Sequence, residues 1–355
     1  MSNFDISEYI ILYVLDKFRD VRCCVAFLCK YSVACKVFEF IVENELAVTG
    51  IEIVRFNVRK VFGIDASSYV LVIRLSATGS IVDRCSVKDI DDRRVVYDIG
   101  FIGGKFYSRL TDVPDIDGAC PFEWRQGIKH DYSSVMELKV VDNDFENKLG
   151  RVVSLEDDLL YPLLKSSSLK KAMIDSSDRR VIVTQHKLGE DTSHIRAEFP
   201  LLWEYLDTNR ELFDKRKSRI YDKAPQFSLF GIGDYAFSKY KVAVSGFYKK
   251  ALFCLVYSDK AIMLDDTCYY LSFDDFDSAY VTMLLLNTPI VEVFLNSIVL
   301  VDSKRPYTKK VLKRIDLAKV MDLVCYDDLV EVENKLCLDN YITEKVLDVY
   351  CSNYF

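Results

Sequence analysis

The sequence predicts an α/β domain that forms half of a Rossmann sheet, followed by a larger α+β domain. Over the first 75 residues, helix-like and strand-like segments alternate, as in sheets built with crossover helices. Beyond about residue 120 the strand-like segments are grouped and no longer alternate with helices. The chain has 355 residues, of which 50% are hydrophobic, so two packed domains of ordinary size are possible.

The α/β pattern can be followed segment by segment. Residues 5–18 carry apolar side chains at helical spacing, namely Ile6, Ile10, Ile11, Val14, Leu15 and Phe18. Residues 23–29 (CCVAFLC) are a short apolar run, as expected of a strand buried on both faces. Residues 31–46 are helical again, and residues 51–56 and 68–75 read as β-branched strands. This order predicts a largely parallel sheet, which would bind ligands at the carboxyl ends of its strands.

Glycine and proline become frequent between residues 80 and 120, which indicates a domain boundary there. We therefore divide the chain into an α/β domain over residues 1–80, a β-rich connector or insertion over 81–120, and an α+β domain over 121–355. In the last of these, the pattern predicts the following elements: a strand at 180–184, a helix at 200–216, paired strands within 227–247, a hairpin from 252–257 and 260–264, a strand at 269–273, an apolar helix or helix pair at 278–298, and helices from 311 onwards.

Composition limits the classes of function. The 11 cysteines form no CxxC pair, so we expect reduced core thiols in a cytoplasmic protein. The chain shows no signal-peptide pattern and no apolar run of the length that crosses a membrane, so we expect no membrane partner. The net charge of -7 is wrong for a general nucleic-acid binder, so DNA contact would require locally clustered Lys and Arg.

Catalytic patterns are scarce. The three histidines lack the spacing of metal ligands, and His130 stands alone beside Asp131, which favours a plain surface or turn position. No GxSxG elbow and no P-loop is present. Gly231 and Gly233 read as a turn, and the aspartate pairs around residues 265 and 275 read as turn or capping groups. We predict no metal site.

Basic residues cluster in three places in the second half of the chain. These clusters predict DNA contact, although a solvated charged face is the alternative. The middle cluster interleaves its cations with aromatic residues, as in surfaces that meet phosphates and bases together. The candidate DNA-binding residues are Lys215, Arg216, Lys217, Arg219, Lys239, Lys241, Lys249, Lys304, Arg305, Lys309, Lys310 and Lys313.

Three stretches near the start resemble the later catalytic-domain motifs of the gamma-class adenine-N6 DNA methyltransferases, the group that includes the TaqI enzyme. They are NFDISEYIILYVLDKF, VAFLCKYSVACKVFEFI and IVRFNVRKVFGIDASSYVLVIRL. The resemblance implies that Phe62, at the family's VF position, stacks on the target adenine after it leaves the duplex. It also suggests that Lys30 and Tyr31 line the rim of that base pocket. Residue type alone favours a core position for Phe62 and ordinary helix-entry positions for Lys30 and Tyr31, whereas the motif around Phe62 favours stacking.

The second half resembles the target-recognition region of the same family. The matching stretches are WRQGIKHD, DLLYPLLKSSSL, FPLLWEYLDTNRELFDKR and FSLFGIGDYAFSKYKVAVSG. The resemblance implies that residues 121–355 read double-stranded DNA, as part of a restriction–modification type of system in a bacterium or archaeon.

One family motif is missing from the sequence. The family's NPPY or NPPW loop requires two adjacent prolines, and none of the seven prolines here is followed by another. The glycine-rich strand that holds S-adenosylmethionine is also absent. We therefore expect the cofactor to be bound mainly by a partner chain that carries the other half of the methyltransferase, with docking along the open sheet edge, or a homodimer there. The chain alone would be inactive. The alternatives are a non-catalytic specificity subunit, a truncated remnant, or an interaction protein unrelated to DNA.

Overall fold

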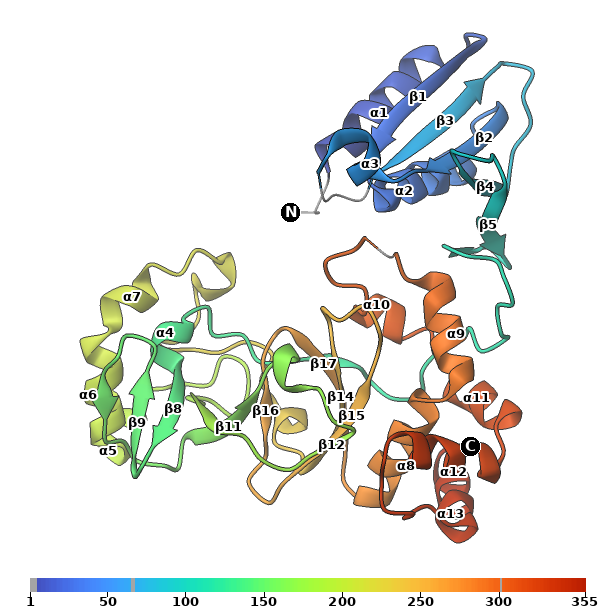
Figure 1. The fold of residues 1–355 in the computed structure, drawn as a ribbon. Helices are drawn as coiled ribbons and strands as arrows, with labels where there is room; N and C mark the ends of the chain where they lie inside the picture. The colour runs from blue at the N-terminus through green and yellow to red at the C-terminus, as the bar shows by residue number, and fades with distance from the viewer. Residues whose placement is uncertain (1–4, 65–67, 301) are drawn as a thin grey trace. The chain divides into compact units, whose positions relative to one another are not determined.

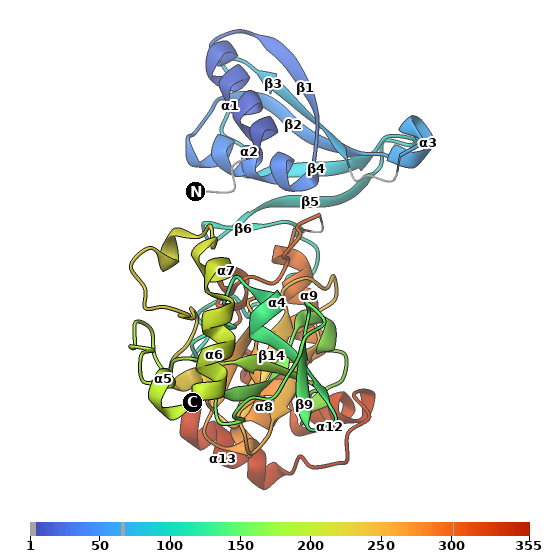
Figure 2. The same ribbon diagram turned by 90° about the vertical axis from the view of Figure 1, so that its left-hand side faces the viewer.

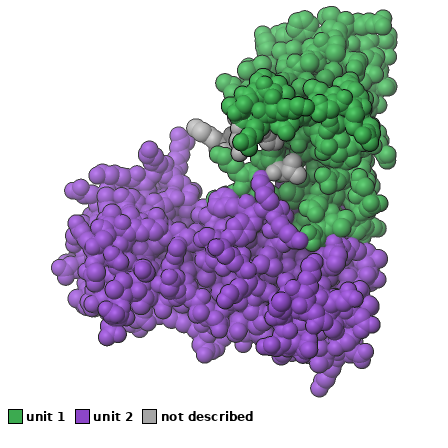
Figure 3. Space-filling model, in the orientation of Figure 1, with its two compact units in different colours: residues 1–115, 292–306 green, residues 116–291, 307–355 purple. Residues whose placement is uncertain are grey.

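The chain folds into two compact units in a computed structural model that describes residues 5–64, 68–300 and 302–355 (Figure 1). The first unit comprises residues 1–115 and 292–306, and the second comprises 116–291 and 307–355 (Figure 3). Residues 1–4 and 65–67 of the stretches that resemble methyltransferases lie outside the described residues. Each unit is described by itself below.

The first unit is an α/β unit with a six-stranded sheet. Its elements are α1 (Ile6–Phe18), β1 (Cys23–Cys29), α2 (Tyr31–Glu43), β2 (Val48–Arg55), α3 (Val58–Phe62), β3 (Tyr69–Leu75), β4 (Arg84–Asp89), β5 (Val95–Ile102) and β6 (Lys105–Tyr107). The helices and strands predicted for residues 5–75 are therefore confirmed, with ends that move by a few residues.

The predicted parallel sheet is wrong in its pairing. The strand order is β1-β3-β2-β4-β5-β6, and β3 lies antiparallel to both β1 and β2. Within the described residues of this sheet, the one parallel pair is β2 with β4. The helix α2 does return the chain so that β1 and β2 run in the same direction. However, the short α3 does not carry the chain back over the sheet, so β3 enters between them in the opposite direction.

Residues 81–107 belong to this same sheet and do not form a separate connector. The strand β4 pairs with β2 from Glu52 opposite Ser86 to Arg55 opposite Asp89, and β5 and β6 extend the sheet beyond it. The boundary between the two units lies at residues 115 and 116, near the end of the predicted boundary region. Residues 292–306 then return to the first unit, which the sequence pattern did not predict.

The core of the first unit lies on one face of its sheet. Ile11 and Leu15 of α1 and the apolar residues of α2 pack with side chains that alternate along the strands, such as Ile53, Leu71 and Ile73. These positions face one side because successive strand side chains point to opposite faces. The second face near β2 carries Glu52, whose carboxylate is buried and paired with Arg74 and Lys88 at 3.0 and 2.7 Å.

The second unit combines two sheets with a set of C-terminal helices. One sheet has the order β10-β9-β8-β13-β11-β16 and the other the order β12-β15-β14-β17-β7 (Figure 1). The strands are β7 (Arg125–Gln126), β8 (Glu137–Val141), β9 (Asp144–Asn147), β10 (Val152–Val153), β11 (Leu160–Leu164), β12 (Met173–Ile174), β13 (Arg179–Ile182), β14 (Tyr240–Ser245), β15 (Phe253–Tyr257), β16 (Met263–Leu264) and β17 (Cys268–Phe273).

The helices cover these sheets and form the C-terminal part of the unit (Figure 2). They are α4 (Ser133–Met136), α5 (Ile195–Glu198), α6 (Pro200–Thr208), α7 (Arg210–Asp214), α8 (Phe276–Leu286), α9 (Pro289–Ile298), α10 (Lys309–Leu312), α11 (Leu317–Leu323), α12 (Tyr326–Lys335) and α13 (Glu344–Tyr354). The α9 helix begins in the second unit and ends in the first.

Three predictions for this unit are wrong in detail. The expected helix at 200–216 is broken at Asn209, whose side-chain amide donates to the carbonyl of Tyr205 at 2.7 Å. The expected hairpin over 252–264 does not form, because β15 pairs with β14 and β16 pairs in parallel with β11. Residues 227–239, expected as part of a strand pair, contain turns and a 3-10 helix at Asp234–Ala236. The structure and strand partners of these short segments depend on tertiary contacts, which the alternation of apolar and polar residues in the sequence does not reveal.

The helix α8 carries apolar side chains on all of its sides, because it lies in the core. Every residue from Ser278 to Leu286 is buried. Among the described residues, no single helix has the length and apolarity to cross a membrane, although α8 and α9, bent by 61° to one another, pass that test as a pair. A core helix of this kind satisfies the same criteria.

A buried glutamate connects the helices at the C-terminal end. Glu333 on α12 is 1% exposed and accepts hydrogen bonds from the hydroxyl of Tyr280 on α8 and from the backbone N–H groups of Tyr341 and Ile342, at 2.6 and 3.0 Å. One carboxylate therefore holds the loop after α12 against α8.

Removing this carboxylate should destabilise the fold. We expect Glu333→Ala to lower the free energy of unfolding by about 2–4 kcal/mol, because it leaves three donors without an acceptor, of which the hydroxyl of Tyr280 and the N–H of Ile342 are buried. The exposed Glu331 on the same helix provides the matched control, and Glu331→Ala should change stability by less than about 0.5 kcal/mol. Urea denaturation followed by circular dichroism measures both, and equal effects would contradict the assigned role of Glu333.

Candidate nucleic-acid interface

The short helix α3 presents an exposed aromatic ring. Asn57 caps its first turn by accepting from the N–H of Lys60 at 3.0 Å, and Gly63, with φ of 70°, ends it in the left-handed conformation. Phe62, the last residue of α3, is 54% exposed and touches Phe56 only edge to face, with ring centroids 6.0 Å apart. The structure therefore excludes the core alternative for Phe62. Figure 2 shows that α3 projects beyond the end of the sheet.

The segments that carry Phe62 and Lys30 begin at the same end of the sheet. In the register of the sheet, Tyr69 at the start of β3 lies opposite both Cys29 of β1 and Arg55 of β2. Lys30 directly follows β1, and the segment that contains Phe62 follows β2. Both therefore start from carboxyl ends of strands, which is the end where open α/β sheets bind ligands. Lys30 is exposed and its ammonium lies 3.3 Å from the carboxylate of Asp5.

The prediction that Tyr31 lines a base pocket is wrong. Tyr31 is 1% exposed, and its hydroxyl donates to the carbonyl of Ser108 at 2.7 Å. Its ring packs between those of Tyr69 and Tyr97, with centroids 5.0 and 6.3 Å away. Tyr31 therefore anchors the start of α2 in the core, and burial raises the pKa of its hydroxyl far above the ordinary range.

A carboxylate occupies the amino end of α2. Asp302, from the segment that returns to the first unit, accepts from the backbone N–H of Ser32 at 3.0 and 3.1 Å and from its hydroxyl at 3.1 Å. The amino end of a helix is otherwise a place where an anionic ligand binds. Here the protein's own carboxylate satisfies it.

The first basic cluster divides into exposed cations and one structural arginine. Lys215, Lys217 and Arg219 follow α7 and are exposed. Arg216 is half-buried, with its guanidinium 3.8 Å from the ring centroid of Tyr221, and it donates to the carbonyls of Ser228 and Phe213 at 2.9 and 3.2 Å. Arg216 was expected to contact DNA but instead braces the loop that carries its three neighbours.

The second cluster is mainly structural. Lys241 was expected to contact DNA, but it is 1% exposed, and its ammonium donates to the carbonyls of Ser238 and Ile262 at 2.6 and 3.1 Å. Lys241 cannot reach a phosphate, because its side chain is buried on β14, the middle strand of the five-stranded sheet. The neighbouring Lys239 is exposed and lies 3.3 Å from Asp259, and Lys249 is also exposed.

The aromatic residues between these cations also serve the fold. Phe237 stacks on His186 with ring centroids 4.5 Å apart and meets Tyr161 edge to face at 5.5 Å. Tyr240 packs edge to face on Phe276 at 6.0 Å. The alternation that suggested base stacking in this segment therefore reflects internal packing.

The third cluster is one run in the sequence but is divided between the two units. Lys304 and Arg305 belong to the first unit, and Lys309, Lys310 and Lys313 to the second. Lys304, Lys310 and Lys313 are exposed, Arg305 is half-buried, and Lys309 lies 3.3 Å from Glu123. The run therefore does not form one continuous patch within either unit.

A buried ionic cluster in the second unit was missed at the sequence level. Glu137 on β8 is 4% exposed and pairs with the ammonium groups of Lys148 and Lys165, both at 2.7 Å, and with Nε2 of His130 at 3.2 Å. Burial alone would raise the pKa of Glu137, but the hydrogen bonds from His130, Lys148 and Lys165 outweigh it and lower the pKa to about 2. For His130 the sequence favoured a surface or turn position. The surface position is wrong, because this histidine is buried, but its Nδ1 accepts from the N–H of Tyr132 at 3.1 Å, as in a turn.

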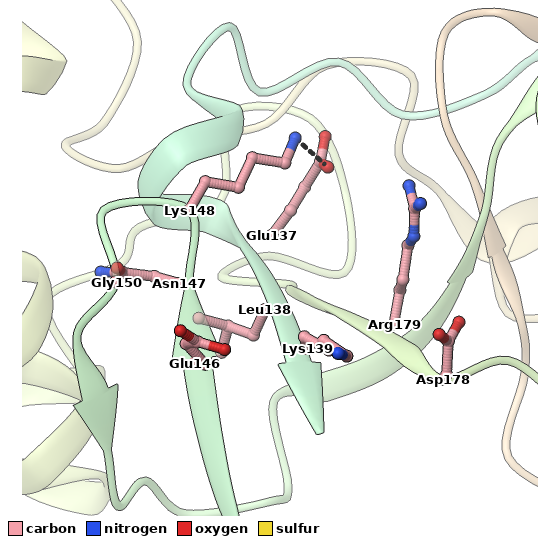
Figure 4. A pocket seen from close by; sticks show the side chains of 9 residues that line it. All are labelled: Glu137, Leu138, Lys139, Glu146, Asn147, Lys148, Gly150, Asp178 and Arg179. Atoms are coloured by element: carbon pink, nitrogen blue, oxygen red, sulfur yellow. Dashed lines mark hydrogen bonds and ion pairs between the residues drawn. The ribbon is translucent and has the colours of Figure 1, made fainter. Parts of the chain in front are cut away.

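Beside this cluster, the surface is hollowed by a cavity of about 610 Å³ on β8, β9 and β13 (Figure 4). Charged residues of both signs line it, including Lys139, Glu146, Asp178 and Arg179. Neither the cavity nor the cluster has a sequence signature. The residues that form them come together only when β8 and β9 pair as a hairpin and β13 joins β8. Among the described residues, no group of three or more His, Cys, Asp or Glu side chains is arranged to hold a metal ion.

Neutralising Lys241 tests its role in the fold. Burial lowers the pKa of Lys241 to about 7, whereas an unfolded lysine keeps its proton up to about pH 10.4. Between these values the unfolded chain binds more protons, so stability should rise with pH, by about 5 kcal/mol at most. We expect Lys241→Met to abolish this rise and to leave DNA affinity unchanged.

The exposed Lys239, two residues earlier, is the matched control for this variant. Lys239→Met should keep the rise of stability with pH, as measured by chemical denaturation between pH 7 and pH 10. A loss of DNA affinity in Lys241→Met, at unchanged stability, would place Lys241 on the DNA surface after all.

Comparison with known proteins identifies a relative. The chain is 35% identical over 322 residues to the Type II methyltransferase M.NspV of Nostoc sp., a match that covers 89% of this chain and 67% of that protein. No family model matches. Among solved structures, the chain is similar to the Type IIL restriction-modification enzyme MmeI in complex with DNA (12% identity, TM-score 0.48, 96% of this chain and 48% of that chain). It is also similar to the type IIG restriction endonuclease BpuSI (12% identity, TM-score 0.39, 94% and 44%).

The chain thus spans about half the length of each of these two solved structures. Its match to M.NspV extends over most of the chain and about two thirds of that relative. The chain therefore belongs to the Type II methyltransferases.

Proposed function

We propose that this chain is the DNA-contacting part of an adenine-N6 DNA methyltransferase of a restriction–modification system. The observation that carries the proposal is the exposed ring of Phe62, held at the carboxyl end of the sheet in a chain of the Type II methyltransferase family. A ring exposed at this end of the sheet is accessible to a ligand there.

Phe62 is suited to stack on a base that has left the duplex. Enzymes that modify a base must extrude it from the stack, and an aromatic face offers it a replacement for its lost neighbours. Gly63 ends α3 directly after Phe62, so the backbone turns away from the ring. Arg59 and Lys60 are exposed on the same helix and can meet the phosphates on either side of the extruded nucleotide.

The second unit supplies contacts to the duplex in this proposal. Lys215, Lys217 and Arg219 are exposed on one braced loop, in which Tyr221 covers Arg216 and donates to the carbonyl of Lys129 at 3.1 Å. A loop fixed in this way loses little conformational freedom when it binds, which favours affinity. Lys310 and Lys313 add two further exposed cations in the same unit.

Methyltransferases of this family use S-adenosylmethionine, and the described residues of the first unit do not fit it. A nucleotide-type ligand requires a glycine-rich turn at a strand end and an open helix amino end. The chain passes from β1 into α2 through Lys30 without a glycine, and Asp302 fills the amino end of α2. We therefore assign no step of methyl transfer to these residues and propose that the donor is held by a further segment.

The second candidate function is a specificity subunit that binds DNA without chemistry. The same lack of fit to the methyl donor favours it. The two functions differ in what happens when a donor-binding segment is added: only a methyltransferase part then supports methyl transfer, whereas a specificity subunit binds DNA in both cases.

Truncating the stacking residue should separate catalysis from binding. In the presence of a donor-binding segment, Phe62→Ala should reduce methyl transfer about 10- to 100-fold, because base–aromatic stacking contributes about 1–3 kcal/mol. Affinity for duplex DNA should change by less than about twofold. Val61→Ala, on the same helix with similar exposure, is the control and should retain activity. Equal losses of affinity and activity would mean that Phe62 supports the fold and does not stack on a base.

Charge reversal on the braced loop should weaken DNA binding at all sequences. For the triple variant Lys215→Glu, Lys217→Glu and Arg219→Glu, we expect lower affinity and a slope of log K against log salt reduced by about 2 to 3, since each lost phosphate contact contributes about 0.9. Fluorescence anisotropy over a salt series measures this slope.

The exposed Lys335 and Lys345 of the C-terminal helices provide a control for net charge. Their reversal to Glu should leave the slope unchanged. If this control lowers the slope as much as the triple variant does, the effect is one of overall charge, and the loop loses its assigned role.

A further inference from the structure

A buried carboxylate on the second face of the first sheet holds three cations. Glu52 on β2 is 5% exposed. Its carboxylate lies 3.0 Å from the guanidinium of Arg74, 2.7 Å from the ammonium of Lys88 and 3.6 Å from the guanidinium of Arg93. The hydrogen bond from Lys88 lowers the pKa of Glu52, so the carboxylate is ionised at neutral pH. These four residues (the Glu52 array below) therefore set three positive charges against one negative charge.

The cations of the Glu52 array reach solvent. The side chains of Arg74 and Arg93 are 48% and 59% exposed, and that of Lys88 is 31% exposed. A single cation would neutralise Glu52, so two of the three positive charges are in excess. Like charges held this close repel one another, and this cost falls when an anionic ligand lies over them.

The buried ionic cluster of the second unit shows the balanced case. There the ammonium groups of Lys148 and Lys165 face two carboxylates, because Lys165 lies 2.7 Å from Glu137 and 3.7 Å from Asp265. The histidine of that cluster accepts a hydrogen bond at Nδ1 and so is uncharged. Two positive charges thus meet two negative ones, as expected where ion pairs serve the fold. The Glu52 array lacks this balance.

Two strand glycines leave room for arginines on the same face. In the register of the sheet, Arg74 of β3 lies opposite Gly50 of β2, and Arg84 of β4 lies opposite Gly100 of β5. A Cβ at Gly50 would meet the side chain of Arg74 at 3.5 Å, so this arginine crosses β2 where no side chain stands. Glycine within a strand often marks a place where another group approaches closely. The exposed Arg84 adds a fourth cation beside the array.

The other carboxylates nearby do not neutralise the array. Asp98 of β5 lies opposite Ser86 and accepts from its hydroxyl at 2.7 Å. Asp89 at the end of β4 and Asp92 in the turn after it each pair with an arginine outside the array. Counted with Arg84 over the described residues, this face of the strands presents four cations against two carboxylates and keeps its excess of positive charge.

We propose that the Glu52 array binds phosphate groups of the DNA strand next to the target base. Two of its three cations are arginines, whose planar fork donates two parallel hydrogen bonds to a phosphate. Glu52 lies three residues before the end of β2, so the array is about 10 Å from the end of the sheet where the Phe62 segment begins. That distance corresponds to about three base steps of a duplex. This inference rests on the proposed function for the nature of the ligand, and inorganic phosphate is the other source of the same chemistry.

The test removes single charges from the array in the full chain. Arg93 has φ of 61°, a conformation that glycine adopts without strain, so Arg93→Gly keeps the turn. Lys88 still pairs with Glu52 in this variant and in Arg74→Gln, so the buried carboxylate keeps a partner. We expect each variant to reduce the slope of log K against log salt for duplex DNA by about 0.9, and the double variant by about 1.8, because each lost phosphate contact releases fewer counterions. Fluorescence anisotropy over a salt series measures the slope.

Arg22→Gln is the matched control, because Arg22 is exposed in the same unit and directly precedes β1, at the other end of the sheet. It should leave the slope unchanged. An unchanged slope in both array variants would overturn the inference, and so would an equal reduction in Arg22→Gln.

Inorganic phosphate, titrated into the full chain by calorimetry, separates the two sources of phosphate. Binding of inorganic phosphate that the double variant abolishes, with an unchanged slope for DNA, would make the free ion the ligand and overturn the inference. A slope that falls as expected, in a chain that supports no methyl transfer with a donor-binding segment, would contradict the proposed function and leave the Glu52 array as a DNA contact.

Discussion

The insertion of β3 between β1 and β2 is the constraint on which the rest of the first unit depends. β3 pairs with both neighbours over their full length, and it brings Cys29 and Arg55 to the same level opposite Tyr69. As a result, Lys30 and the α3 segment start from one end of the sheet. The same insertion leaves β1 at the border, with one side of its backbone unpaired in the described part of the chain. One pairing choice therefore produces both the exposed ring of Phe62 and the open edge.

Hydrophobic periodicity predicted the long elements well. The helix at 5–18 and the strands at 23–29 and 68–75 are present as α1, β1 and β3, because each is a clear helical repeat or apolar run. The expectation that residues 23–29 are buried on both faces is wrong, because β1 lies at the border of the sheet and every second side chain up to Leu28 is exposed. The direction of β3 was not predictable, since the spacing of apolar residues along a strand is the same in parallel and antiparallel sheets. The short strands β15 and β16 were assigned the wrong partners, because pairing between distant segments depends on contacts that no local window contains.

The exposure of a candidate site residue was predictable where its residue type and its neighbours in the sequence indicated the same local structure. Phe62 sits between Asn57, a helix-capping residue, and Gly63, a helix-ending one, so its short exposed helix is encoded locally. Lys241 shows the opposite case. A lysine in an alternating strand is expected at the surface. However, β14 is buried on both faces, and two backbone carbonyls accept hydrogen bonds from the ammonium group of Lys241. Tyr31 was misplaced for a similar reason, since its partner Ser108 lies 77 residues further along the chain.

Two kinds of polar group therefore coexist in the molecule. Glu137, Glu333 and Lys241 are buried, Arg216 is half-buried, and all four maintain the fold, whereas Lys215, Lys217 and Arg219 remain exposed on a braced loop. This separation leaves a locally basic surface on an acidic chain, as the proposed contact with DNA requires.

Methyl transfer to duplex DNA, with S-adenosylmethionine as donor, tests the central claim most directly. Unmodified duplex DNA is incubated with the chain alone, with a donor-binding methyltransferase segment alone, and with both, and its nucleosides are then identified by mass spectrometry. The account predicts N6-methyladenine only when both polypeptides are present. Transfer by the chain alone, or a methyl group on another base, would contradict it.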